Sequence, residues 1–83
     1  MQTTDNMERL QQVVGTVLNI PASVVDEDTS PDTHTSWDSL SHIDLVVALE
    51  GVFGVSFTAE DTMEMLSVRL IRMILEERGV SFG

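Results

Sequence analysis

The residues best placed to do chemistry in this sequence are a serine and the aspartate before it. Ser39 lies in the tetrapeptide Trp37-Asp38-Ser39-Leu40, where a long polar segment meets a predicted helix. The first backbone N–H groups of a helix have no helical partner, and the helix dipole is positive at that end. A phosphate ester on the Ser39 hydroxyl would therefore be stabilised there. The alternative is that Asp38 or Ser39 only caps the helix, which is the commoner role of such a pair.

The two histidines add little catalytic chemistry. His42 follows Ser39 by three residues and so lies on the next helical turn, while His34 lies in the polar segment. A nucleophilic serine needs a general base and an oxyanion hole, and no nucleophile-elbow motif surrounds Ser39. Two histidines without a third spaced ligand do not make a zinc site. The sequence therefore predicts no catalytic residue, and it predicts that the protein is not an enzyme.

Acidic residues in the polar segment partly match a calcium-binding loop. The pattern Asp26-x-Asp28-x-Ser30 fits the first three ligand positions of an EF-hand. The sixth position should be glycine and is Pro31, and the twelfth should be a bidentate glutamate and is Trp37. We therefore predict no metal site, and the clustered acids leave only weak binding of divalent cations open.

Hydrophobic periodicity predicts the helices that position these residues. A first helix can be capped by Asp5 and ends near Asn19, because Pro21 disfavours helical geometry at the residue before it. Its inward stripe is Leu10, Val13, Val14, Val17 and Leu18. An irregular segment follows as far as Trp37. The residues expected to pack that segment on the core are Ile20, Val24 and Val25.

The predicted second helix begins at residue 38 or 39, reaches about residue 51 and has a surplus of apolar side chains. The residues expected to face the core are Leu45, Leu49 and Val52, with Val46 and Phe53 beside them. A further row, turned away from the core, is Leu40, Ile43 and Val47. We therefore expect one apolar row on the surface.

Two more helices complete the prediction. Thr58 and Asp61 form a capping-box-like start for a short helix that reaches about Met65, and Ser67 caps a last helix that Gly79 ends. The inward residues of the last helix are Val68, Ile71, Ile74 and Leu75, and the methionines assigned to the core are Met7, Met63, Met65 and Met73. The fold class is all-α, a small four-helix bundle with a long first loop and a short third helix. We expect one domain over residues 1–83, with flexible ends at 1–5 and 80–83.

Length and charge limit the function further. The chain of 83 residues has room for one small domain, and it has no cysteine to act as a nucleophile or thiolate ligand. The net charge is −10, and the span from Asp26 to Glu64 holds ten acidic residues and no basic one. Such a field repels nucleic acid and anionic lipid and attracts proteins that present Arg or Lys, although acids that simply maintain solubility are the plainer explanation. We expect a cytoplasmic monomer that binds neither nucleic acid nor membrane.

Several motifs follow one another in a characteristic order around Ser39. They are Asp28-Thr29-Ser30, Asp38-Ser39-Leu40, Ile43-Asp44-Leu45-Val46-Val47-Ala48-Leu49-Glu50 and Phe53-Gly54-Val55. This order resembles the acyl carrier proteins over nearly the whole chain. The resemblance implies that a phosphopantetheinyl transferase uses coenzyme A and Mg²⁺ to attach a 4′-phosphopantetheine arm to Ser39. The arm would carry acyl groups as thioesters, and a cysteine-free chain needs such a borrowed thiol.

The resemblance also implies a surface for docking partner enzymes. Its residues are Asp38, Leu40, Ile43, Asp44, Val47, Glu50 and Glu64. The implied partners are the transferase and acyl-loading, ketosynthase or other acyl-transferring enzymes. Ser41 and Gly51 stand where many fatty-acid carriers have acids. Trp37 before the triplet and Gly54-Val55 after Phe53 resemble carriers of polyketide or peptide-linked pathways more closely. Two alternatives stay open: an aminoacyl carrier, D-alanyl or peptidyl, and an acidic docking module that bears no arm.

Overall fold

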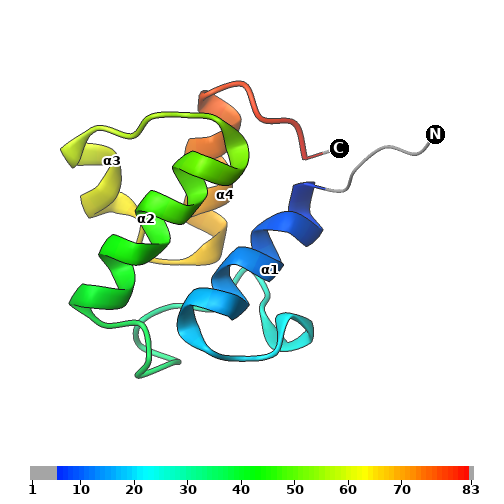
Figure 1. Ribbon diagram of the computed structural model, residues 1–83, viewed down its shortest axis with the longest axis vertical. Helices are drawn as coiled ribbons and strands as arrows, with labels where there is room; N and C mark the ends of the chain where they lie inside the picture. Colours follow the sequence, from blue (N-terminus) through cyan, green and yellow to red (C-terminus); the bar gives the residue numbers. More distant parts are fainter. Residues whose placement is uncertain (1–5, 83) are drawn as a thin grey trace.

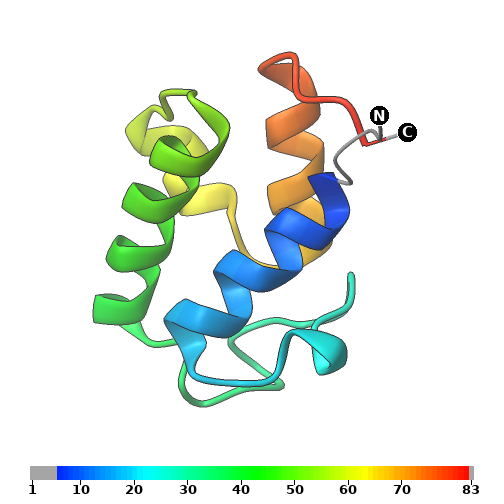
Figure 2. The same cartoon turned by 45° about the vertical axis from the view of Figure 1, so that its right-hand side comes forward.

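Four helices make up the computed structural model, which describes residues 6–82. In chain order the elements are α1 (Asn6–Leu18), the 3-10 turn η1 (Ala22–Val24), α2 (Ser39–Phe53), α3 (Ala59–Glu64) and α4 (Val68–Glu77). α1 and α2 pack against each other, and Figures 1 and 2 show the short α3 beside α2. No strand occurs within residues 6–82. The predicted all-α bundle with a short third helix is confirmed, whereas Asp5 lies outside the described residues.

α1 ends where the sequence predicts. Asn19 takes a left-handed conformation with φ of 59°, and Pro21 follows. Gly15 is needed at this end, because a Cβ there would lie 2.7 Å from the carbonyl oxygen of Ile20. From the predicted stripe the fully buried residues are Leu10, Val14 and Leu18, and those packed half-buried against the core are Val13 and Val17. The stripe therefore faces the core as expected.

The long connection between α1 and α2 is tied to the start of α4. Thr29 is buried, and its carbonyl oxygen accepts a hydrogen bond from the N–H of Val68 at 3.0 Å. Val25 is buried as predicted, and its carbonyl oxygen accepts from the Gln11 side chain at 2.9 Å. The prediction for Val24 is wrong, since its side chain is 50% exposed. The turn η1, which the sequence analysis did not foresee, directs Val25 inward and its neighbour outward.

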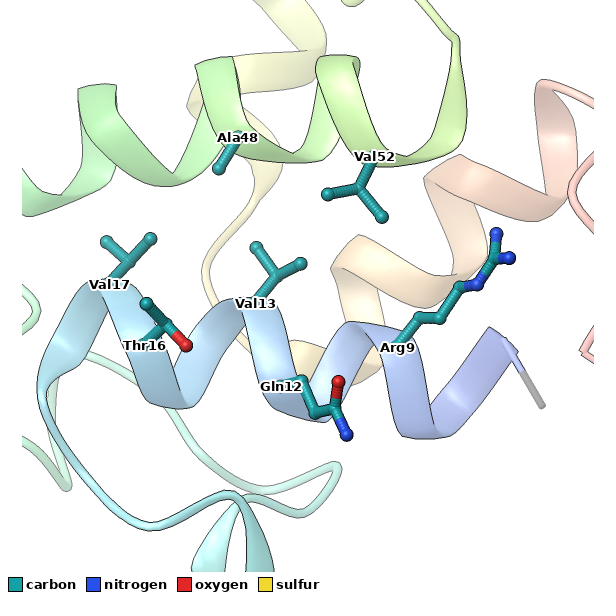
Figure 3. A pocket seen from close by; sticks show the side chains of 7 residues that line it. All are labelled: Arg9, Gln12, Val13, Thr16, Val17, Ala48 and Val52. Carbon is teal, nitrogen blue, oxygen red and sulfur yellow. The ribbon is translucent and has the colours of Figure 1, made fainter. Parts of the chain in front are cut away.

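α2 is longer than predicted and faces the core with fewer residues. It continues to Phe53 and ends at Gly54, whose φ of 67° is the left-handed conformation that favours glycine. Leu45 and Leu49 are fully buried, but Val52, predicted to be a core residue, is 44% exposed. The reason is an open groove of about 370 Å³ between α1 and α2, into which Val52 points (Figure 3). The other residues that line it are Arg9, Gln12, Val13, Thr16, Val17 and Ala48.

The capping interactions predicted for α3 and α4 are present. The Thr58 hydroxyl accepts from the N–H of Asp61, and an Asp61 carboxylate oxygen accepts from the N–H of Thr58, both at 3.0 Å. The Ser67 hydroxyl accepts from the N–H of Leu70 at 3.2 Å. The predicted inward residues of α4 are all buried: Val68, Ile71, Ile74 and Leu75. After α4, Val80 and Phe82 pack half-buried against the core.

The core draws on α1, the long connection, α2, the residue that follows α3, and α4. Its buried hydrophobic residues are Leu10, Val14, Leu18, Val25, Trp37, Leu45, Leu49, Met65, Val68, Ile71, Ile74 and Leu75. Trp37 is the aromatic residue among them and comes from the long connection, directly before the tripeptide that contains Ser39. Among residues 6–82, no helix has both the length and the apolar character that crossing a membrane requires.

Candidate functional site

Ser39 is the first residue of α2, and its hydroxyl is free. The capping role belongs to Asp38, whose Oδ1 accepts from the N–H of Ser41 at 2.9 Å. Ser39 is exposed, and within residues 6–82 its hydroxyl has no hydrogen-bond partner. The sequence left two roles open for this pair of residues, and each residue takes one of them. Asp38 caps the helix, and the Ser39 hydroxyl is available for modification at the positive end of the helix dipole.

The charge of Asp38 is fixed by the same cap. Hydrogen bonding from the backbone N–H of Ser41 lowers the pKa of the Asp38 carboxyl below its ordinary value of 3.8. Asp38 is therefore ionised at neutral pH, one residue before Ser39. An exposed carboxylate at this position attracts a basic surface on an approaching protein.

An open groove of about 640 Å³ adjoins Ser39. Its residues come from the end of the long connection, from the first turns of α2, and from α3 and the residues after it: Pro31, Trp37, Asp38, Ser39, His42, Ile43, Thr62, Met63, Met65 and Leu66. Most of these side chains are apolar, so the surface beside the serine suits an apolar group. His42 lies here, on the turn after Ser39, where the sequence analysis puts it.

The surplus apolar row of α2 lies on the surface, as expected. Leu40 is 75% exposed, Ile43 58% and Val47 63%. Asp44 on the same helix and Glu64 at the end of α3 are also exposed. Glu50 differs from the other predicted docking residues, because it is half-buried and its Oε2 accepts from the N–H of Phe57 at 2.8 Å. The Glu50 carboxylate thus holds the connection between α2 and α3.

The sequence analysis missed part of the apolar surface at this site. It assigned the methionines to the core, which is right for Met65 but wrong for Met63 and Met73, which are exposed. Met63 and Leu66 line the groove beside Ser39, and Leu66 is also exposed. A helix of only six residues carries too little periodicity to show which of its sides faces solvent. The run Met63-Glu64-Met65-Leu66, in which apolar residues flank an acidic one, was the signal in the sequence that could have indicated this exposed apolar surface.

The acids of the calcium-like pattern are used to hold the long connection. Oδ1 of Asp26 accepts from the N–H of Asp28 at 2.9 Å. Arg69 on α4 lies 3.2 Å from the Glu27 carboxylate and 3.3 Å from that of Asp28. In the described part of the chain no three His, Asp or Glu side chains converge in a way that suits a metal ion.

These observations define a class of protein: a small all-α domain that presents an exposed serine at the head of its second helix. Residues 8–71 match the family described as "Phosphopantetheine attachment site". The match spans most of the chain, and the chain belongs to this family. A search of curated proteins found no match.

Membership in the family defines the cofactor and the general role. Domains of this family are the attachment site of covalently bound 4′-phosphopantetheine, and they are generally carriers without catalysis of their own. They work with phosphopantetheinyl transferases and acyl-handling enzymes. The residues at the head of α2 fit this group. Ser39 is exposed, its hydroxyl has no hydrogen-bond partner among residues 6–82, and the helix terminus favours a phosphate.

Proposed function

We propose that Ser39 bears the 4′-phosphopantetheine arm and that the protein carries acyl or polyketide intermediates on it as thioesters. The observation that supports this most strongly is the free Ser39 hydroxyl at the start of α2, beside the capping residue Asp38. The arm supplies a thiol, a group that this cysteine-free sequence lacks. The chain itself supplies the anchor, the helix terminus that stabilises the phosphate, and the surfaces that partners recognise.

An acyl cargo fits the groove beside Ser39 better than an aminoacyl cargo. The groove is lined by Ile43, Met63 and Leu66, whose exposed side chains favour contact with a hydrocarbon chain. An aminoacyl group such as D-alanyl is short and carries an ammonium group that gains nothing from these side chains. The aminoacyl carrier is therefore the second candidate. It predicts loading by an adenylating enzyme instead of an acyltransferase.

Partner enzymes are proposed to dock on the exposed side of α2. The row Leu40, Ile43 and Val47 offers apolar contact, and exposed acids beside it offer charge to basic patches on the partner. Asp38, Asp44 and Glu64 keep their proposed docking role. For Glu50 the role is weaker, since its carboxylate is already bound to the N–H of Phe57.

The attachment is tested by intact mass. The protein is incubated with coenzyme A, Mg²⁺ and a broad-specificity phosphopantetheinyl transferase, and the variants Ser39→Ala and Ser41→Ala are treated in parallel. We expect wild type and Ser41→Ala to gain one arm and Ser39→Ala to gain none. Failure of the wild type with several transferases would favour the docking module without an arm. Charging the arm-bearing protein with acyltransferases and with adenylating enzymes then separates the two cargo classes.

A further inference from the structure

His42 joins three elements next to Ser39 through two hydrogen bonds. The indole Nε1–H of Trp37 donates to Nδ1 of His42 at 3.0 Å, and Nε2 of His42 lies 2.8 Å from the carbonyl oxygen of Thr62. An indole nitrogen only donates, and a carbonyl oxygen only accepts. One form of the ring satisfies both bonds: the neutral imidazole with its proton on Nε2. We call this arrangement the Trp37–His42–Thr62 link.

α3 depends on such ties because it is short. It has six residues, of which Asp61 is the buried one, and a helix of this length has little stability of its own. The carbonyl groups of its last turn also lack helical partners. Thr62 carries one of them, and its other contact, the N–H of Met65, lies at 3.4 Å. Asp61 is paired with Arg78, the residue that follows α4. Polar ties on two sides therefore hold α3 in place.

The link runs along the groove that adjoins Ser39. Trp37, His42 and Thr62 all line this groove. Met65 lines it as well and is fully buried in the hydrophobic core. A movement of α3 away from α2 would widen the groove and uncover Met65. The link therefore sets the width of the space at the anchor point of the arm.

We propose that neutral His42 is a positioning residue that holds α3 against α2 and keeps the groove beside Ser39 narrow, and that protonation of His42 loosens this hold. A protonated imidazole carries N–H at both nitrogens, so Nδ1–H would face the Trp37 Nε1–H, donor against donor. The ring must then turn away from the indole. The proposal rests on the proposed function only for its consequence, since the groove matters if the arm is attached to Ser39.

Other charged groups lie on the elements that pack against the link, and a change in their charge could also affect it. Asp38, which lines the same groove, is held by the N–H of Ser41, and Asp61 on α3 is held by Arg78. The remaining titratable residues on these segments are Asp26, Glu27, Asp28, Asp32 and His34 in the long connection, Asp44 and Glu50 on α2, and Glu60 and Glu64 on α3. A pH effect on the link must therefore be separated from these groups by a variant that changes His42 alone.

Two variants of His42 make that separation. His42→Gln keeps an acceptor and a donor on a side chain that does not titrate, whereas His42→Leu has neither. Trp37 is the one tryptophan of the sequence, so its indole N–H gives a single NMR signal. We expect amide hydrogen exchange at residues 62–66 to be about tenfold faster in His42→Leu and within about twofold of wild type in His42→Gln. If protonation of His42 breaks its bond to the indole, acidification should move the indole signal in wild type and leave it in place in His42→Gln.

The decisive control needs no variant. In wild type at pH 8, nitrogen NMR of the His42 ring should show the proton on Nε2, and a proton on Nδ1 would overturn the proposal. Equal exchange in His42→Gln and His42→Leu would overturn it too. Intact mass after arm attachment is measured on the same three proteins. Loss of attachment in all of them contradicts the proposed function alone, because the exchange and ring measurements are made on the protein without an arm.

Discussion

Val47→Asp tests whether the apolar row of α2 is a docking surface or part of the core. Val47 is 63% exposed, so only about a third of its side chain is removed from water. Full burial of a valine contributes about 1.5–3 kcal/mol, and valine and aspartate have similar helix propensities. We therefore expect Val47→Asp to lower the free energy of unfolding by less than about 1 kcal/mol. Leu45→Ala, at a fully buried position two residues earlier, should cost about 2–5 kcal/mol.

The two measurements needed are thermal unfolding and the rate of arm transfer. In a domain of this size about 1 kcal/mol corresponds to about 4–8 °C in Tm. Val47→Asp should thus shift Tm by a few degrees and slow arm transfer by about tenfold or more, because an apolar contact is replaced by a charge. Val24→Asp is the matched control, since Val24 is 50% exposed and lies in η1. Its transfer rate should stay at the wild-type value. A Tm loss in Val47→Asp equal to that of Leu45→Ala would refute the assignment of this side of α2.

Three further changes test other parts of the structure. Gly51→Ala should raise the free energy of unfolding by about 0.5–1 kcal/mol, because the position is helical and a Cβ there meets no atom within 4 Å. Gly54→Ala should lower it by about 1–2 kcal/mol, because φ is 67°; urea unfolding of both variants checks the pair. Hydrogen bonding from the N–H of Thr58, aided by Arg78, lowers the pKa of Asp61 below 3.8. The contribution of ionised Asp61 to the free energy of unfolding is therefore fully present above pH 3.8, and it is lost as the pH falls through the lowered pKa. Asp61→Asn should reduce this acid dependence in unfolding curves taken at several pH values, and an unchanged dependence would refute the role of Asp61.

The helices could be predicted because their signals are local. The stripe of α1, the caps at Thr58 and Ser67 and the inward side of α4 depend on residues three or four positions apart in the sequence. The exposed row of α2 could also be predicted, since one helix cannot turn two apolar rows toward one small core. The position of Asp38-Ser39-Leu40 at the start of a helix could likewise be predicted from the neighbouring residues.

The errors arise where a residue's surroundings are set by distant segments. Val52 has the spacing of a core residue, but α1 leaves a groove opposite it. Met63 has a core-like side chain on a helix too short to show which side is buried. The Trp37–His42–Thr62 link joins residues that are 20 positions apart at its longer step, and no local pattern marks such a pair. Glu50 likewise gains its partner, the N–H of Phe57, from the folded connection.

The central claim is that Ser39 carries the arm, and the most direct measurement is made on the protein purified from its natural host. Intact mass gives the number of attached arms, and fragmentation of the peptide that contains Ser36, Ser39 and Ser41 shows which serine is modified. We predict one phosphopantetheine group, on Ser39. A native protein that always has the mass of its amino-acid sequence, or an arm on a different serine, would contradict the account.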